Sequence, residues 1–195
     1  KAKTYNEDGY KIVSTSFTTS KMTYPNNVLG LEGNHQIENA VVAIGIAEIL
    51  QEFNLEITNF DILMGLETAN HKGRLEYYHN ILFDGAHNIA GAKALRAYLE
   101  DFVSQPITLI FGAMKDKQIT EIGEILFPLA DVLILTEVEN ARTAKVEGIY
   151  KFAQNQANVI LTQNISEALE IAKTFPDNLT CVTGSLYLVG EAQKI

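Results

Sequence analysis

The stretch Ile81-Leu82-Phe83-Asp84-Gly85-Ala86-His87-Asn88 is a short apolar run that passes through a polar turn into a helical pattern. In a parallel α/β sheet, ligands bind where such strands end, because the turn delivers side chains into a crevice and the next helix offers free backbone N–H groups. The stretch therefore predicts a strand, a ligand-facing turn and a helix in succession.

Five such units follow one another from residue 80 to the end of the chain. We expect strands buried on both faces in the short β-rich apolar runs at residues 81–83, 107–111, 132–136, 159–162 and 179–183. In the first and fourth of the segments that follow these runs, apolar residues recur at helical spacing: Ala92, Leu95, Tyr98, Leu99 and Phe102, then Ile165, Ala168, Leu169 and Ala172. This alternation predicts an α/β domain with a mostly parallel sheet.

The first 70 residues have a different pattern. Residues 10–19 alternate like an antiparallel strand, and residues 24–27, with Gly30 and Gly33 behind them, read as turns. We therefore expect a separate domain here.

A long helix is expected at residues 36–53. It is apolar nearly all round, so it should be buried between layers, and we expect residues outside this chain to complete its core. A second short helix at about residues 60–66 leads into a polar linker at residues 68–73. The predicted domains are therefore 1–71 and 72–195.

Composition limits the classes of partner. Hydrophobic residues make up 47% of the chain and charged residues 20%, as in ordinary globular domains. A net charge of -9 argues against nucleic acid as a partner, and the longest apolar run, residues 40–47, is far short of a membrane span. Cys181 is the only cysteine, which excludes an internal disulfide and fits a small core residue in a reducing compartment. We expect a cytoplasmic protein, since the first ten residues contain no secretory signal pattern.

Asp84 and His87 are the leading candidates for chemistry. A carboxylate at this sheet edge can hold a ribose hydroxyl or a metal-bound water, and an imidazole can meet a phosphate or a carboxylate. The alternative is structural: Asp84 caps the turn and Asn88 caps the helix.

Ser185 is the second candidate. It lies in Thr183-Gly184-Ser185-Leu186, where a strand again runs through a glycine into a helix. A hydroxyl beside free N–H groups suits a carboxylate or phosphate, but the pattern alone favours the alternative, a simple helix N-cap.

Asn39 and Arg74 are candidates for nucleotide binding. An amide that enters an apolar helix needs partners, which a nucleotide base supplies, although capping explains the neighbouring His35 and Gln36. Arg74 follows the predicted linker, where a guanidinium can reach a phosphate; a surface ion pair with Glu76 is the alternative.

Further charges lie on the same sheet edge. Residues 115–117, Lys-Asp-Lys, follow the second predicted strand and Arg142 follows the third, so they make the edge locally positive unless they form a solvated loop. His71 and His79 have no zinc-ligand spacing, and no Walker-type phosphate loop is present.

Taken in order, five segments resemble the second half of the folylpolyglutamate synthase/dihydrofolate synthase family, a branch of the Mur ligase superfamily. They are Gly33-Asn34-His35-Gln36-Ile37-Glu38-Asn39-Ala40, Gly73-Arg74-Leu75-Glu76, Asp84-Gly85-Ala86-His87-Asn88, the Phe-Gly-x-x-x-Asp-Lys loop at residues 111–117, and Gly-Ser-Leu-Tyr-Leu-Val-Gly at residues 184–190. Each segment is weak alone, and the resemblance covers nearly the whole chain. It implies a Rossmann-like C-terminal domain preceded by the tail of the central ATPase domain.

The resemblance also implies roles. Asn39, Arg74 and Asp84 would contact ATP, His87 would lie near the reacting phosphate or the incoming amino acid, and Ser185 would help to hold glutamate. Asp84 and His87 would be the catalytic pair. In the family, ATP phosphorylates a folate carboxylate and the amine of L-glutamate attacks the acyl phosphate. Magnesium is required, and its ligands are expected in an amino-terminal part outside this chain, which alone would be inactive; the full-length enzyme would be a monomer.

Departures from the family pattern are few. Ile89 stands where the family usually has proline, and Asn70-His71-Lys72 replaces a tryptophan-proline pair. Two alternatives stay open: another Mur-type ligase that acts on a cell-wall or peptide precursor, or a non-enzymatic nucleotide or amino-acid binding module.

Overall fold

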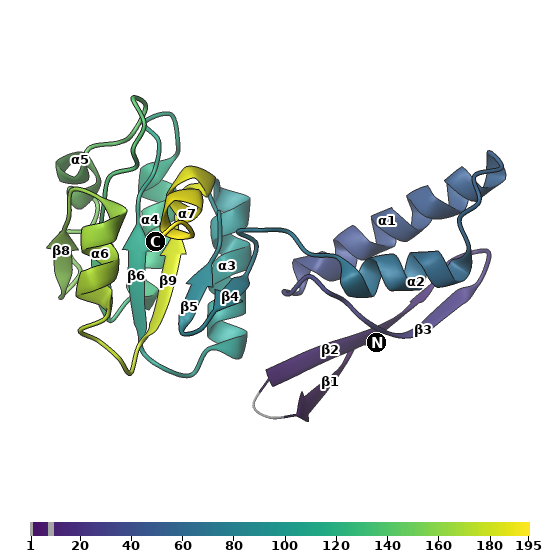
Figure 1. Ribbon diagram of the computed structural model, residues 1–195. Helices are drawn as coiled ribbons and strands as arrows, with labels where there is room; N and C mark the ends of the chain where they lie inside the picture. Colours follow the sequence, from purple (N-terminus) through teal and green to yellow (C-terminus); the bar gives the residue numbers. More distant parts are fainter. Residues whose placement is uncertain (1, 8–9) are drawn as a thin grey trace. The chain divides into compact units, whose positions relative to one another are not determined.

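A computed structural model describes residues 2–7 and 10–195 and divides the chain into two compact units, Lys1–His71 and Lys72–Ile195 (Figure 1). The first unit begins with a three-stranded antiparallel sheet of order β1-β2-β3, followed by two helices. The elements are β1 (Ala2–Glu7), β2 (Tyr10–Thr18), β3 (Thr23–Val28), α1 (His35–Glu52) and α2 (Asn59–Thr68). The antiparallel strand predicted at residues 10–19 is confirmed.

The turn predicted at residues 24–27 is wrong, because these residues lie inside β3. Tyr24 is fully buried in the core of the unit, which a turn residue would not be. The turn-like composition reflects an irregular edge strand: Asn26 has a φ of 51°, and the pairing of β2 with β3 shifts register between Thr15 and Phe17. Pro25 is tolerated because an edge strand need not donate every backbone N–H.

Helix α1 has two apolar faces. Ala40 and Ile44 are buried against the sheet and α2, where Phe17, Tyr24 and Ile62 complete the core. A second stripe at spacings of four, three and four residues is half or more exposed: Val42, Ile46, Ile49 and Phe53. No described residue covers this stripe, and the expectation that residues outside this chain complete the core of the helix stays a prediction.

A buried carboxylate ties α1 to the sheet. Glu48 is 6% exposed, and its Oε1 accepts hydrogen bonds from Thr19 Oγ1 at 2.7 Å and from the Tyr24 hydroxyl at 3.0 Å. Burial, and secondly the hydrogen bond to Glu48, raises the pKa of Tyr24 from 10.0 to about 12. Polar bonding at the core thus fixes the helix on the sheet.

The second unit is a six-stranded sheet of order β4-β5-β9-β6-β7-β8. The strands are β4 (Glu76–Tyr78), β5 (Ile81–Phe83), β6 (Ile107–Phe111), β7 (Val132–Leu135), β8 (Val159–Leu161) and β9 (Leu179–Thr183). All neighbours pair in parallel except β4 and β5, which form an antiparallel hairpin. The prediction of a mostly parallel α/β sheet is confirmed, and all five predicted strands are present, two of them one residue shorter.

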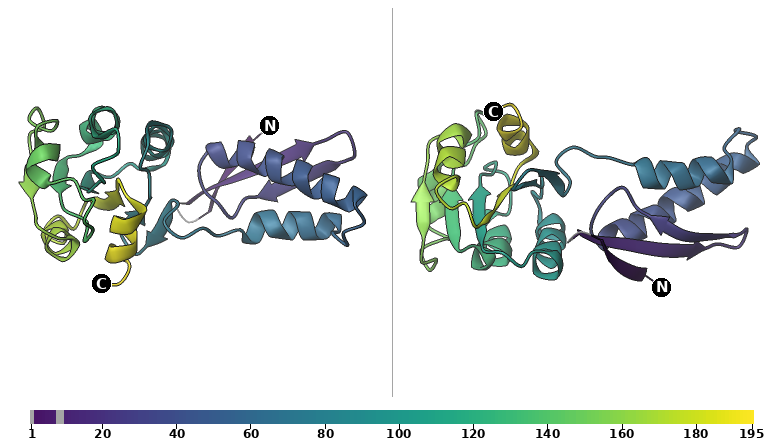
Figure 2. Two further views of the ribbon diagram at one scale, coloured as in Figure 1. Left: turned by 90° about the horizontal axis from the view of Figure 1, so that it is seen from above. Right: turned by 60° about the horizontal axis from the view of Figure 1, so that its bottom comes forward.

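Helices cover both faces of this sheet (Figures 1 and 2). One core joins the sheet to α3 (Ile89–Phe102), α4 (Ile119–Leu126) with the short helix η1 (Phe127–Leu129), and α5 (Val146–Tyr150). The other core joins it to α6 (Ile165–Ala172) and α7 (Leu186–Ala192). Successive residues of β6 alternate between them: Leu109 and Phe111 enter the first core and Ile110 enters the second.

The apolar positions predicted for α3 and α6 lie in these cores, Phe102 being only partly buried. Strand β4 was not predicted, and β8 is an edge strand with Leu161 41% exposed, so the expectation of burial on both faces is wrong there. Cys181 is buried in β9 as predicted; burial, and secondly the Asp84 carboxylate, raises the pKa of its thiol. Among the described helices, none is both long and apolar enough to cross a membrane.

Candidate functional site

The candidate site lies where four adjacent parallel strands, β5, β9, β6 and β7, end at the same edge of the sheet. Glycines let the backbone approach closely there. Gly184 has a φ of 99°, and a Cβ on it would lie 2.7 Å from the carbonyl oxygen of Gly112. A Cβ on Gly112 would in turn lie 2.8 Å from the carbonyl oxygen of Thr136. Bulkier residues would separate the loops that carry the polar side chains.

Asp84 follows β5 and is 6% exposed. Its Oδ2 accepts a hydrogen bond from Leu75 N and its Oδ1 accepts one from Ala86 N, each at 3.0 Å. Asn88 caps α3 by accepting from Gly91 N at 2.8 Å. The structural interpretation of Asp84 and Asn88 is thus confirmed as geometry, and a catalytic or nucleotide-binding role for Asp84 stays a prediction.

His87 projects from the same turn. Its Nδ1 lies 2.8 Å from the Gly85 carbonyl oxygen, which only accepts, so Nδ1 carries the hydrogen of this bond. The ring is thereby oriented, and Nε2 is the nitrogen available to a ligand.

A small pocket of about 150 Å³, here called the edge pocket, opens at this edge. Its lining residues come from the ends of all four strands: His87, Met114, Asp116, Lys117, Arg142, Gly184, Ser185, Leu186 and Tyr187. The structure therefore brings together two of the predicted site residues, His87 and Ser185, with the basic residues of the two charged loops.

Ser185 is 3% exposed and forms the N-cap of α7, where its Oγ accepts from Tyr187 N at 3.1 Å. The N-cap interpretation is confirmed. The hydroxyl hydrogen can still be donated to a ligand in the pocket, because a serine hydroxyl is both an acceptor and a donor.

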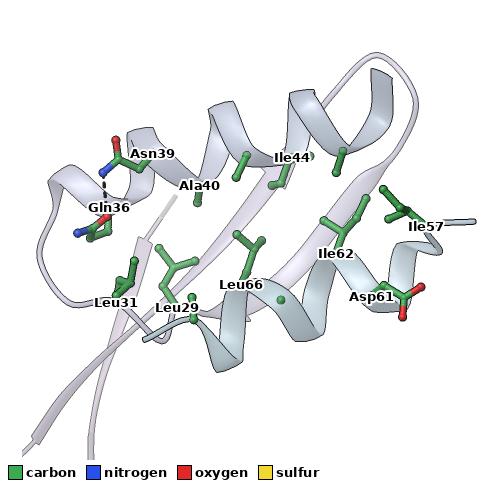
Figure 3. A pocket seen from close by; sticks show the side chains of 14 residues that line it. Leu29, Leu31, Gln36, Asn39, Ala40, Ile44, Ile57, Asp61, Ile62 and Leu66 are labelled. Atoms are coloured by element: carbon green, nitrogen blue, oxygen red, sulfur yellow. Dashed lines mark hydrogen bonds between the residues drawn. The ribbon is translucent and has the colours of Figure 1, made fainter. Parts of the chain in front are cut away.

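Asn39 and Arg74 are not among the residues that line the edge pocket. Asn39 lies in the first unit, at one end of a groove of about 360 Å³ between α1 and α2 whose walls are mostly aliphatic (Figure 3). Its Nδ2 donates to Gln36 Oε1 at 2.8 Å. The alternative of an Arg74–Glu76 ion pair is not found among the ion pairs of the described residues. Glu76 Oε2 instead accepts from Gly73 N at 2.7 Å and from Gln193 Nε2 at 2.8 Å.

The fold and the edge pocket together define a class: a parallel α/β ligand-binding domain with a polar, partly basic site at the carboxyl edge of its sheet. The profile of the dihydrofolate synthetase C-terminal domain matches residues 67–195. This chain belongs to that family.

Known relatives agree with this assignment. The chain is 27% identical over 186 residues to a dihydrofolate synthase/folylpolyglutamate synthase of Bacillus subtilis and 30% identical over 169 residues to a folylpolyglutamate synthase of Lacticaseibacillus casei. These matches cover 92% and 84% of this chain but only 43% and 39% of the relatives. The chain thus spans less than half the length of the relatives that it matches.

Solved structures show the same fold. The folylpolyglutamate synthase of Thermotoga maritima matches with a TM-score of 0.77 at 28% identity, over 94% of this chain and 43% of that one. The folylpolyglutamate synthase of Mycobacterium tuberculosis complexed with ADP and AMPPCP matches with a TM-score of 0.82 at 24% identity, over 98% of this chain and 46% of that one.

Proposed function

We propose that this chain is the carboxyl-terminal part of an ATP-dependent ligase that joins L-glutamate to a folate, in dihydrofolate synthesis, polyglutamate extension or both. Residues 1–71 would be the end of its central ATPase domain and residues 72–195 its glutamate-binding domain. Family membership and the names of the relatives support the reaction class. The observation that carries the proposal is the edge pocket, in which His87, Lys117, Arg142 and Ser185 meet.

The proposed reaction has two steps. A folate carboxylate oxygen attacks the γ-phosphorus of ATP and gives an acyl phosphate and ADP. The glutamate amine then attacks the acyl carbon, the C–O bond to phosphate breaks, and the amine loses a proton. Positioning and charge stabilisation account for most of the catalysis of such phosphoryl transfers.

Each proposed residue has a task that its surroundings permit. His87, oriented by Gly85, has an Nε2 that accepts a hydrogen bond from the amino group of the amino acid while the ring is neutral, and donates one to a phosphate oxygen only when the ring is protonated. Ser185 donates to a substrate carboxylate. Asn39 and Arg74 are the proposed nucleotide contacts. Asp84 is proposed as a third, and its bonds to Leu75 N and Ala86 N also hold the turn.

A divalent cation is expected from the reaction class, since the phosphates of ATP carry it. Among the described residues no group of three His, Cys, Asp or Glu side chains could hold a metal ion. The proposal places the ligands of this cation in the rest of the protein, as the resemblance implies.

Steady-state kinetics of the full-length protein test the proposal. ATP- and folate-dependent ligation of L-glutamate is expected, with kcat lowered about 100-fold in His87→Ala and the glutamate KM raised about 10-fold in Ser185→Ala. Ser166→Ala, an exposed serine outside the edge pocket, is the matched control and should behave as wild type. Turnover of a cell-wall precursor in place of every folate would overturn the folate assignment.

A further inference from the structure

More positively than negatively charged side chains line the edge pocket. Lys117 and Arg142 line it together with one carboxylate, that of Asp116. Lys117 Nζ lies 3.2 Å from Asp116 Oδ2, and this bond is the main reason why the pKa of the Asp116 carboxyl is lowered; the charges of Lys117 and Arg142 contribute less. Asp116 therefore offsets the positive charge of Lys117 more than that of Arg142. No ion pair found in residues 15–195 involves Arg142, so its guanidinium supplies the excess positive charge.

The backbone at Arg142 is well anchored. Its carbonyl oxygen accepts from Lys115 N at 2.9 Å, its own N donates to Asn140 Oδ1 at 2.9 Å, and Thr143 forms a β-bridge with Met114. The loop after β7 is therefore pinned to the loop after β6. The exposed Arg142 side chain starts from a fixed point at the rim of the pocket, as a recognition residue requires.

The size of the pocket limits its ligand. About 150 Å³ is well below the roughly 300 Å³ at which sites for drug-sized ligands begin, so a nucleotide or a folate does not fit inside it. An amino acid is of the right size. A planar guanidinium with parallel N–H donors matches a carboxylate with two hydrogen bonds.

We infer that Arg142 binds a carboxylate of the incoming acidic amino acid and so determines that the ligase selects glutamate. This inference rests on the proposed function, and it assigns the recognition to a residue on a loop that none of the five family-like segments contains. His87 and Ser185, on the opposite strands of the pocket, would hold the rest of the amino acid.

The test is steady-state kinetics of the full-length ligase with Arg142→Ala, Arg142→Lys and Lys145→Ala. Lys145 is the matched control, because it lies on the same loop and loses the same charge but points its Nζ to Glu137 and does not line the edge pocket. We expect Arg142→Ala to raise the glutamate KM about 10- to 100-fold, with kcat and the KM values for ATP and folate within about two-fold of wild type. Arg142→Lys should restore part of the loss, and Lys145→Ala should match wild type.

The outcomes are distinguishable. A glutamate KM in Arg142→Ala within two-fold of wild type overturns the inference alone. An equal loss in all kinetic constants, with a lowered melting temperature and no rescue by lysine, also overturns it, because that pattern marks a structural role. A wild-type protein that ligates no glutamate overturns the proposed function, and the inference with it.

Discussion

At the scale of single residues, Gly184 is one of the glycines that let the backbone segments around the edge pocket approach closely. Its φ of 99° is costly for any other residue, and its Cβ position lies 2.7 Å from both the Gly112 carbonyl oxygen and the Phe111 ring. We expect Gly184→Ala to lower the free energy of unfolding by roughly 2–4 kcal/mol, measured by urea denaturation. Gly190→Ala is the control: outside the neighbouring backbone of α7, no atom lies within 4 Å of its Cβ position, so it should raise stability by about 0.5–1 kcal/mol. Equal effects would contradict this account of Gly184.

A substitution at Asp84 should lower the free energy of unfolding by a similar amount. Both of its oxygens accept from backbone N–H groups, so in Asp84→Asn one N–H would face an amide NH₂. We expect the free energy of unfolding, measured by urea denaturation, to fall by about 1–3 kcal/mol. The reverse exchange, Asn88→Asp, keeps an acceptor for Gly91 N and should be nearly neutral. If Asp84→Asn left stability unchanged, the turn would not depend on this carboxylate, and any loss of activity would be purely chemical.

The raised pKa of Tyr24 predicts that the free energy of unfolding depends on pH. Its pKa in the folded chain is about 12 against 10.0 in the unfolded chain, so the folded state holds the proton more tightly. The resulting stability is fully present below pH 10 and is lost as the pH rises towards 12. Urea denaturation between pH 8 and 12 should show this decline, with a shallower one in Tyr24→Phe. Parallel declines in the two proteins would refute the raised pKa.

At the scale of elements, the sequence predicts best where one physical signal dominates. Strands β5, β6 and β9 match their predicted bounds, because each is a buried apolar run ended by polar residues or glycine. β3 was missed because Pro25 and the two asparagines after it look like a turn, and only the tertiary contact that buries Tyr24 makes the segment a strand. β4 was missed because three half-exposed residues carry almost no pattern.

The edge pocket was only half predictable. His87 and Ser185 follow apolar runs directly, so their place at the sheet edge could be expected. Arg142 could be placed at that edge, but its meeting with Lys117 depends on the bridge between Met114 and Thr143. An isolated β-bridge between two loops produces no periodic pattern in the sequence, so it could not be predicted.

Helix α1 makes the sharpest prediction about an element. Its exposed stripe should make the isolated 195-residue chain bind a hydrophobic dye and self-associate. Ile46→Lys with Ile49→Lys should abolish both effects without unfolding the chain, as measured by light scattering and circular dichroism. Ile44→Lys, on the buried face of the same helix, should instead unfold the first unit. A wild-type chain that stays monomeric and binds no dye would favour a free-standing binding module.

At the scale of the whole molecule, the chain matches less than half of each relative. In the proposed full-length protein, the remaining parts would supply the packing partner that the exposed stripe of α1 lacks here. The proposed catalysis belongs to the full-length protein, in which we propose that this chain contributes the amino-acid site.

The most direct test follows an isotope through the reaction of the full-length protein. A folate substrate whose reacting carboxylate carries ¹⁸O at both oxygens is incubated with ATP and L-glutamate, and the released nucleotide and phosphate are analysed by mass spectrometry. Ligation through an acyl phosphate predicts one labelled oxygen in the inorganic phosphate for each amide formed. Label in AMP, unlabelled phosphate, or no amide at all would contradict the proposed ligase.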